Sequence, residues 1–123
     1  MSHEDELPAF IRGHLGSVWA LEILLLLRRD SRRAWSVGEL VQELRASTAL
    51  VSTNLAKFEA SGLVLADDGR RYRYAPASSL MRDLCDAVDL AYRERPVAII
   101  NLISAPEDRL QRLADAFRFK GGK

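Results

Sequence analysis

Short hydroxyl and amide side chains, together with one lysine, are concentrated within residues 47–57. Such side chains exchange hydrogen bonds with phosphates and base edges, and a lysine can reach a phosphate. If Val51, Leu55 and Phe58 form the buried stripe of a helix, the other residues face outward from its first turns, with Asn54 at the boundary, where it could pair with adenine. The expected contact residues are Ser47, Thr48, Ala49, Ser52, Thr53, Asn54 and Lys57.

The small size of these side chains would let the helix sink deep into the major groove of DNA. The alternative is that they are only small, soluble surface residues. The stretch contains Lys57 but no arginine, although a bidentate Arg–guanine contact is the commonest specific base contact. Sequence readout would then depend on DNA shape and on a second basic segment.

That second segment follows the turn Asp67-Asp68-Gly69 and contains Arg70, Arg71 and Arg73. Strand alternation places Arg71 and Arg73 on one face, packs Tyr72 and Tyr74 on the other, and leaves Arg70 at the tip of a tight hairpin. A basic hairpin tip would contact the DNA backbone or minor groove. The alternative is an edge strand whose charges prevent sheet-to-sheet association.

Helices must position these two segments. Apolar periodicity predicts a single, most buried helix from Pro8 to about Arg28, followed by a charged loop over 28–33. Ser36 and Glu39 form a capping box that opens a helix ending near Ala46. Ser47 then caps the helix that carries the hydroxyl residues, which ends at Ser61-Gly62. Strands are expected over 63–66 and 70–74.

The C-terminal third reads as helical. One helix opens at Ser78 or Ser79 and ends at Arg95, an apolar helix starts at Pro96, and a capping box at residues 104–107 opens another. Apolar side chains on these helices are expected to form a twofold dimer interface, the alternative being that they complete the core of one chain. The dimer residues expected are Leu84, Val88, Val97, Ile99, Ile100 and Ile103.

Segment 47–64, S-T-A-L-V-S-T-N-L-A-K-F-E-A-S-G-L-V, resembles the recognition-helix signature of winged-helix repressors of the multiple-antibiotic-resistance (MarR) and arsenical-resistance (ArsR) types. The matching positions are Ser47, Val51, Ser52, Leu55, Lys57 and Gly62-Leu63-Val64. In element order the resemblance covers about residues 15 to 75. It implies a winged helix-turn-helix whose flanking helices form a twofold dimer.

Composition narrows the function classes. The 123 residues carry 18 Lys+Arg against 17 Asp+Glu, a net charge of +1, so any DNA binding must come from local clusters. The single Cys85 allows no intramolecular disulfide and, with two histidines, no four-ligand zinc site; no cofactor is expected. The start of the chain lacks a basic signal region and no apolar run could span a bilayer, so we expect a cytoplasmic protein.

No phosphate loop, Ser/His/Asp set or paired carboxylates occur in a recognisable context, so no enzyme is expected. Trp19 and Trp35 are expected in the core, His14 in the core or at its boundary, and Cys85 in packing. An aromatic-lined pocket for a small effector stays open.

The predicted fold class is mainly α with a small β-hairpin wing, a winged helix-turn-helix flanked by N- and C-terminal helices. The expected parts are a flexible acidic segment 1–7, the DNA-binding domain 8–76, dimerisation helices 77–119 and a disordered tail 120–123. The predicted function is a sequence-specific double-stranded-DNA-binding transcription regulator, as a homodimer on a palindromic operator. The alternative is a winged helix for protein contact, such as an adaptor in the transcription machinery.

Overall fold

The computed structural model describes residues 6–104, and within them six helices and one two-stranded antiparallel hairpin. The mainly helical prediction with a small hairpin is confirmed. Residues 1–5 of the expected flexible segment 1–7, the tail 120–123 and the helix expected after residue 104 lie outside the described residues, whereas Leu7 begins the first helix. The elements are α1 (Leu7–His14), α2 (Val18–Arg29), α3 (Val37–Leu44), α4 (Thr48–Ala60), β1 (Val64–Ala66), β2 (Tyr72–Tyr74), α5 (Ser79–Glu94) and α6 (Pro96–Ser104).

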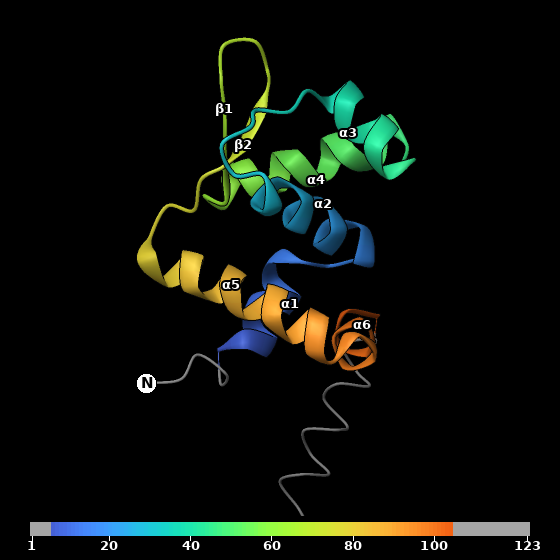
Figure 1. Ribbon diagram of the computed structural model, residues 1–123, viewed down its shortest axis with the longest axis vertical. Coiled ribbons are helices and arrows are strands. Elements are labelled where there is room, and N and C mark those ends of the chain that lie inside the picture. The colour runs from blue at the N-terminus through green and yellow to red at the C-terminus, as the bar shows by residue number, and fades with distance from the viewer. Residues whose placement is uncertain (1–5, 105–123) are drawn as a thin grey trace, which may run out of the picture.

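Helix α2 lies at the centre of the fold. Above it in Figure 1 are α4, α3 and the hairpin, and below it are α5, α1 and α6. It contacts α3, α4, α6 and β2, and Leu21, Leu24 and Leu27 on it are fully buried. A helix that is apolar almost all round must be covered on all sides, which explains its central place.

The single helix predicted from Pro8 to Arg28 is wrong, because the chain breaks it into α1 and α2 with axes bent by 103°. Ser17 adopts an extended conformation, and its side chain accepts a hydrogen bond from the Ala20 backbone N–H at 3.1 Å. This N-cap starts a new helix although the apolar pattern runs on through the junction. Among the described residues no single helix is long and apolar enough to cross a membrane; only the bent pair taken together would be.

Local hydrogen bonds fix where α3 and α4 begin. Ser36 and Glu39 make both bonds of the predicted capping box, at 3.1 and 2.9 Å. Ser47 caps α4 by accepting from the Leu50 N–H at 3.1 Å. The predicted stripe of Val51, Leu55 and Phe58 is buried, so α4 packs against the core through the expected side.

The hairpin pairs Val64 with Tyr74 and Ala66 with Tyr72. Its return strand begins at Tyr72, not at Arg70 as predicted, and the tight Asp-Gly turn is instead a longer loop with Arg70 in the left-handed region at φ +58°. The Asp67 carboxylate causes this by accepting from the backbone N–H groups of Gly69 and Arg71 at 3.0 and 2.9 Å.

Trp35 adds an isolated antiparallel bridge to the hairpin, because its backbone exchanges two hydrogen bonds with that of Tyr72, at 2.8 and 2.7 Å. Its side chain is buried, as predicted. The same prediction for Trp19 is wrong, since 40% of its surface is exposed at the start of α2. Periodicity alone did not separate the two, because a tryptophan's burial depends on which elements cover it.

Gly62 ends α4 in the left-handed conformation predicted for it, at φ +80°, and a Cβ there would lie 3.0 Å from the Ala77 Cβ. We expect Gly62→Ala to lower the free energy of unfolding by about 1–2 kcal/mol, measured by urea denaturation. The control is Gly38→Ala, because Gly38 is helical and exposed with no neighbour closer than 4.0 Å, and alanine there should stabilise by up to about 1 kcal/mol. Equal losses in both variants would contradict this expectation.

Candidate nucleic-acid interface

The solvent-facing surface of α4 is made of small polar side chains. Six of the seven residues predicted here are exposed on it or on its cap: Ser47, Thr48, Ala49, Ser52, Thr53 and Lys57. The opposite side of the helix is anchored by buried Val51, Leu55 and Phe58. The exposed surface of the helix therefore offers hydroxyl groups, the cation Lys57 and, toward its end, the carboxylate Glu59.

Asn54 differs from the prediction that placed it at the accessible boundary. Only 8% of its surface is exposed, and its Nδ2 donates to the Leu50 carbonyl at 2.9 Å. Asn54 is buried together with Val51, Leu55 and Phe58, so the packed side of the helix is wider than the predicted stripe. Pairing with adenine uses both amide atoms, and here one of them is engaged with the helix backbone.

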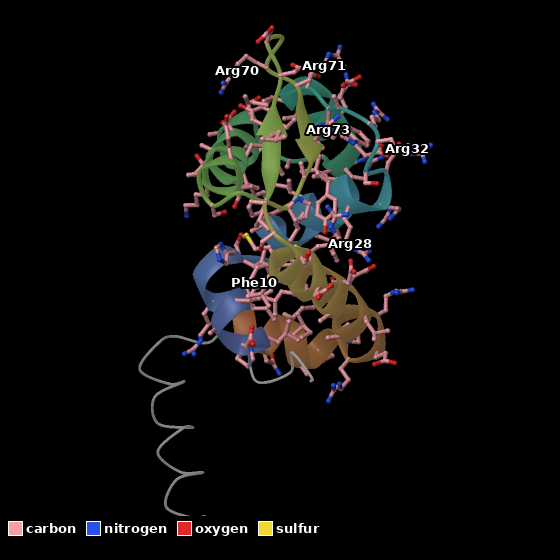
Figure 2. The ribbon with its side chains drawn as sticks, turned by 90° about the vertical axis from the view of Figure 1, so that its left-hand side faces the viewer. Phe10, Arg28, Arg32, Arg70, Arg71 and Arg73 are labelled. Carbon is pink, nitrogen blue, oxygen red and sulfur yellow. The ribbon has the colours of Figure 1, made fainter. Side chains whose placement is uncertain are left out.

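The three arginines of the hairpin do not share one side. In Figure 2, Arg70 lies on the left of the hairpin tip, the side on which α4 lies, while Arg71, Arg73 and Arg32 lie on the right. Arg71 and Arg73 share the exposed face, as alternation predicted, and line a hollow with Ala34. This face turns away from the exposed residues of α4.

Arg71 is also held in an ion pair, because its Nη1 lies 3.2 Å from the Glu39 carboxylate at the start of α3. Arg33 approaches the same carboxylate at 3.3 Å. The pKa of Glu39 lies below its ordinary value because the carboxylate accepts the Ser36 N–H and faces these two arginines. Arg71 is thus partly neutralised where it stands.

Arg70 is exposed at the tip and is oriented by its neighbour Tyr72. Its Nη2 donates to the Tyr72 hydroxyl at 2.7 Å, and its guanidinium lies 5.5 Å from the centre of the Tyr72 ring. The Tyr72 side chain is itself buried, which fixes this partner. Of the three hairpin arginines, Arg70 is the one that the structure brings to the side of α4.

The predicted dimer residues divide into two groups. Leu84, Val88 and Ile99 are buried within the chain's own core, which fits the alternative that the C-terminal helices complete the core of one chain. They lie on α5 and α6, which contact each other and α1. Val97 is 68% exposed, and Ile100 and Ile103 are half-buried.

A basic groove beside α4 escaped the sequence-based prediction. It has a volume of about 560 Å³ and lies between α4 and the α1–α2 junction. Arg12 and His14 line one wall, and Thr53 and Lys57 line the other. The signal that could have revealed it is Gly16-Ser17, a helix-breaking pair before a new apolar run.

The one cysteine of the chain lies in the core. Cys85 is fully buried on α5, and burial raises the pKa of its thiol to about 11. A thiol is reactive as the thiolate, which this environment disfavours. The expectation that Cys85 serves packing agrees with this placement.

Comparison of the chain with family models, with curated proteins and with solved structures found no match. The chemical character of this surface therefore comes from its own residues: a hydroxyl-rich helix face, one arginine at the hairpin tip on the same side, and a basic groove along the helix flank.

Proposed function

We propose that this protein is a sequence-specific double-stranded-DNA-binding transcription regulator acting in the cytoplasm, with α4 as its recognition helix. The observation that carries the proposal is the exposed face of α4, which is polar, carries only two long side chains, Lys57 and Glu59, and is anchored from behind by Val51, Leu55 and Phe58. A winged helix-turn-helix consists of two packed helices followed by a β-hairpin. The contacts of α3 with α4, and the hairpin that pairs with Trp35, support this arrangement here.

The dimensions support insertion of α4 into DNA. The major groove of B-DNA is about 12 Å wide and admits one helix. With short side chains at Thr48, Ala49 and Ser52, the helix can approach base edges closely, so that hydroxyl groups reach them directly or through water. Lys57 is long enough to reach a phosphate at the groove edge.

We further propose that two copies bind a palindromic site. Apolar surface on the C-terminal helices supports this, because Leu90 on α5 is 50% exposed and Val97 on α6 is 68% exposed. Exposed apolar side chains on neighbouring helices favour association with another chain. A twofold dimer would present two α4 helices to successive major-groove faces.

The test is selection of bound sequences from a random double-stranded DNA pool at low and moderate salt, with sizing chromatography of the same preparation. Enrichment of a roughly palindromic site by a dimer is expected, with affinity that falls steeply as salt rises. No retention of DNA even at low salt would overturn the proposal and favour the second class of function, a winged helix that binds a protein.

The hairpin contact has its own test, Arg70→Asn. Asparagine tolerates the left-handed backbone and removes the charge. We expect affinity for the selected site to fall about 3- to 10-fold, and the slope of log affinity against log salt to decrease by about one phosphate contact. Binding is measured by fluorescence anisotropy over a salt series. The matched control, Arg73→Ala, removes a charge from the opposite side of the hairpin and should change affinity less. A larger effect of Arg73→Ala would reverse this assignment.

A further inference from the structure

The basic groove continues as an open trough along the flank of α4. A second hollow, lined by Gly13, His14, Lys57, Ala60 and Ser61, adjoins the first through shared residues. Together they run from the N-cap of α4 to its last residue, on the side facing the α1–α2 junction. In Figure 2, α1 lies below α4 on the same side of the molecule.

The side chains that line the trough are either basic or uncharged. Arg12 and His14 come from α1 and Lys57 from α4, and no acidic residue is among those that line it. Within residues 6–104, the ion pairs involve neither Arg12 nor Lys57. The Arg12 Nε donates to the Pro8 carbonyl at 3.4 Å, which leaves its two Nη groups for another acceptor.

Two glycines leave the α1 side of the trough without side chains at their positions. A Cβ built at Gly13 or at Gly16 would meet no atom within 4 Å, so space above both residues is open. Bare backbone at a binding surface allows a ligand to approach closely. The trough is therefore basic, elongated and open, unlike the enclosed and mainly apolar pockets that hold small molecules.

We infer that this trough receives the sugar-phosphate backbone of one strand of the DNA that α4 enters, with Arg12 and His14 as phosphate contacts from outside the helix-turn-helix. This inference rests on the proposed function. A helix in the major groove is flanked by the two phosphate backbones, so an anionic strand must pass along the side of α4. The α1–α2 junction lies along that side, which gives the sharp bend a role in binding.

A matched pair of variants at Gly13 tests the contact. Gly13 is exposed near the end of α1 with open space around it, so Gly13→Glu and Gly13→Gln should both fold, and they differ only in charge. We expect Gly13→Glu to weaken binding to random-sequence double-stranded DNA at least 10-fold, and Gly13→Gln to change it less than 3-fold. Thermal unfolding of both variants checks that the fold is retained.

The second measurement is the salt dependence of Arg12→Ala. Loss of one phosphate contact should reduce the slope of log affinity against log salt by about 0.9. Arg29→Ala is the control, because Arg29 is exposed at the far end of α2 from the junction, and its slope should stay that of the unchanged protein.

The outcomes separate this inference from the proposed function. If the unchanged protein binds DNA but the two Gly13 variants bind equally and Arg12→Ala keeps its slope, the trough contact is wrong and the role of α4 stands. If the unchanged protein binds no DNA, both are wrong.

Discussion

Ser52→Glu is expected to abolish specific DNA binding while leaving the fold unchanged. Ser52 is exposed near the middle of α4, within the face proposed to enter the major groove. A carboxylate there would be desolvated between base edges and phosphates with no partner, which costs about 2–5 kcal/mol in comparable interfaces. A loss at the lower end of that range already corresponds to about 30-fold in affinity, and we expect more than 100-fold. Fluorescence anisotropy with the selected site at constant salt measures it.

Two controls isolate the position and the charge. Ser52→Gln adds similar bulk without charge and should weaken binding less, since an amide can still pair with base edges. Ser31→Glu adds the same charge at an exposed position in the turn after α2, outside α4 and the C-terminal helices, and should leave affinity nearly unchanged. If Ser52→Glu and Ser31→Glu bind the selected site equally well, α4 is not the reading helix.

The elements that sequence predicts best are those fixed by neighbours in the chain. The side chains of Ser36 and Glu39 each accept a hydrogen bond from the other residue's backbone N–H, within one helical turn. The Ser47 hydroxyl caps α4 by accepting from a backbone N–H three residues later. Such contacts need no distant partner, so composition and spacing are enough. The buried stripe of α4 follows from the same local period.

The bend before α2 escaped prediction because two local signals compete there. Apolar spacing continues from Phe10 through Leu15 to Leu21, while Ser17 offers a cap that breaks the helix. Once the chain bends, α1 contacts α5 and α6, and the trough lies between the bend and α4. The helix cap at Ser17 therefore affects two features at once: the position of α1 against the C-terminal helices and the shape of the groove beside α4.

The alternation of the hairpin was predicted correctly, whereas the side of the hairpin that lies beside α4 was not predicted from the sequence. Tyr72 is buried and Arg73 exposed, as a period of two requires. Which side of the hairpin lies beside α4 depends instead on Trp35, a residue far away in the chain that pairs with Tyr72. A pairing between residues so far apart in the chain leaves no local pattern in the sequence. The sequence therefore could not show that Arg70, unlike Arg71 and Arg73, lies on the side of α4.

Phe58→Ala is expected to cause the largest loss of stability of any change considered for α4. Phe58 is 1% exposed and is among the largest fully buried side chains of the core. Truncation of a buried phenylalanine costs about 3–5 kcal/mol, against a total of about 5–15 kcal/mol for an ordinary domain. Urea denaturation followed by circular dichroism should give a much lower midpoint, and Phe58→Leu, which keeps most of the volume, should lose about 1.5 kcal/mol or less.

The comparison of Phe58→Ala with Ser52→Glu separates the two sides of α4. The buried side fixes where the helix lies, so Phe58→Ala should reduce DNA binding only through the fraction of unfolded protein, and binding should recover where the variant is fully folded, at low temperature or with added osmolyte. The exposed side makes the contacts, so Ser52→Glu should lose binding at an unchanged urea midpoint. Loss of affinity in fully folded Phe58→Ala would mean that repacking moves α4 itself, because a helix held by one buried stripe shifts when its largest anchor is removed.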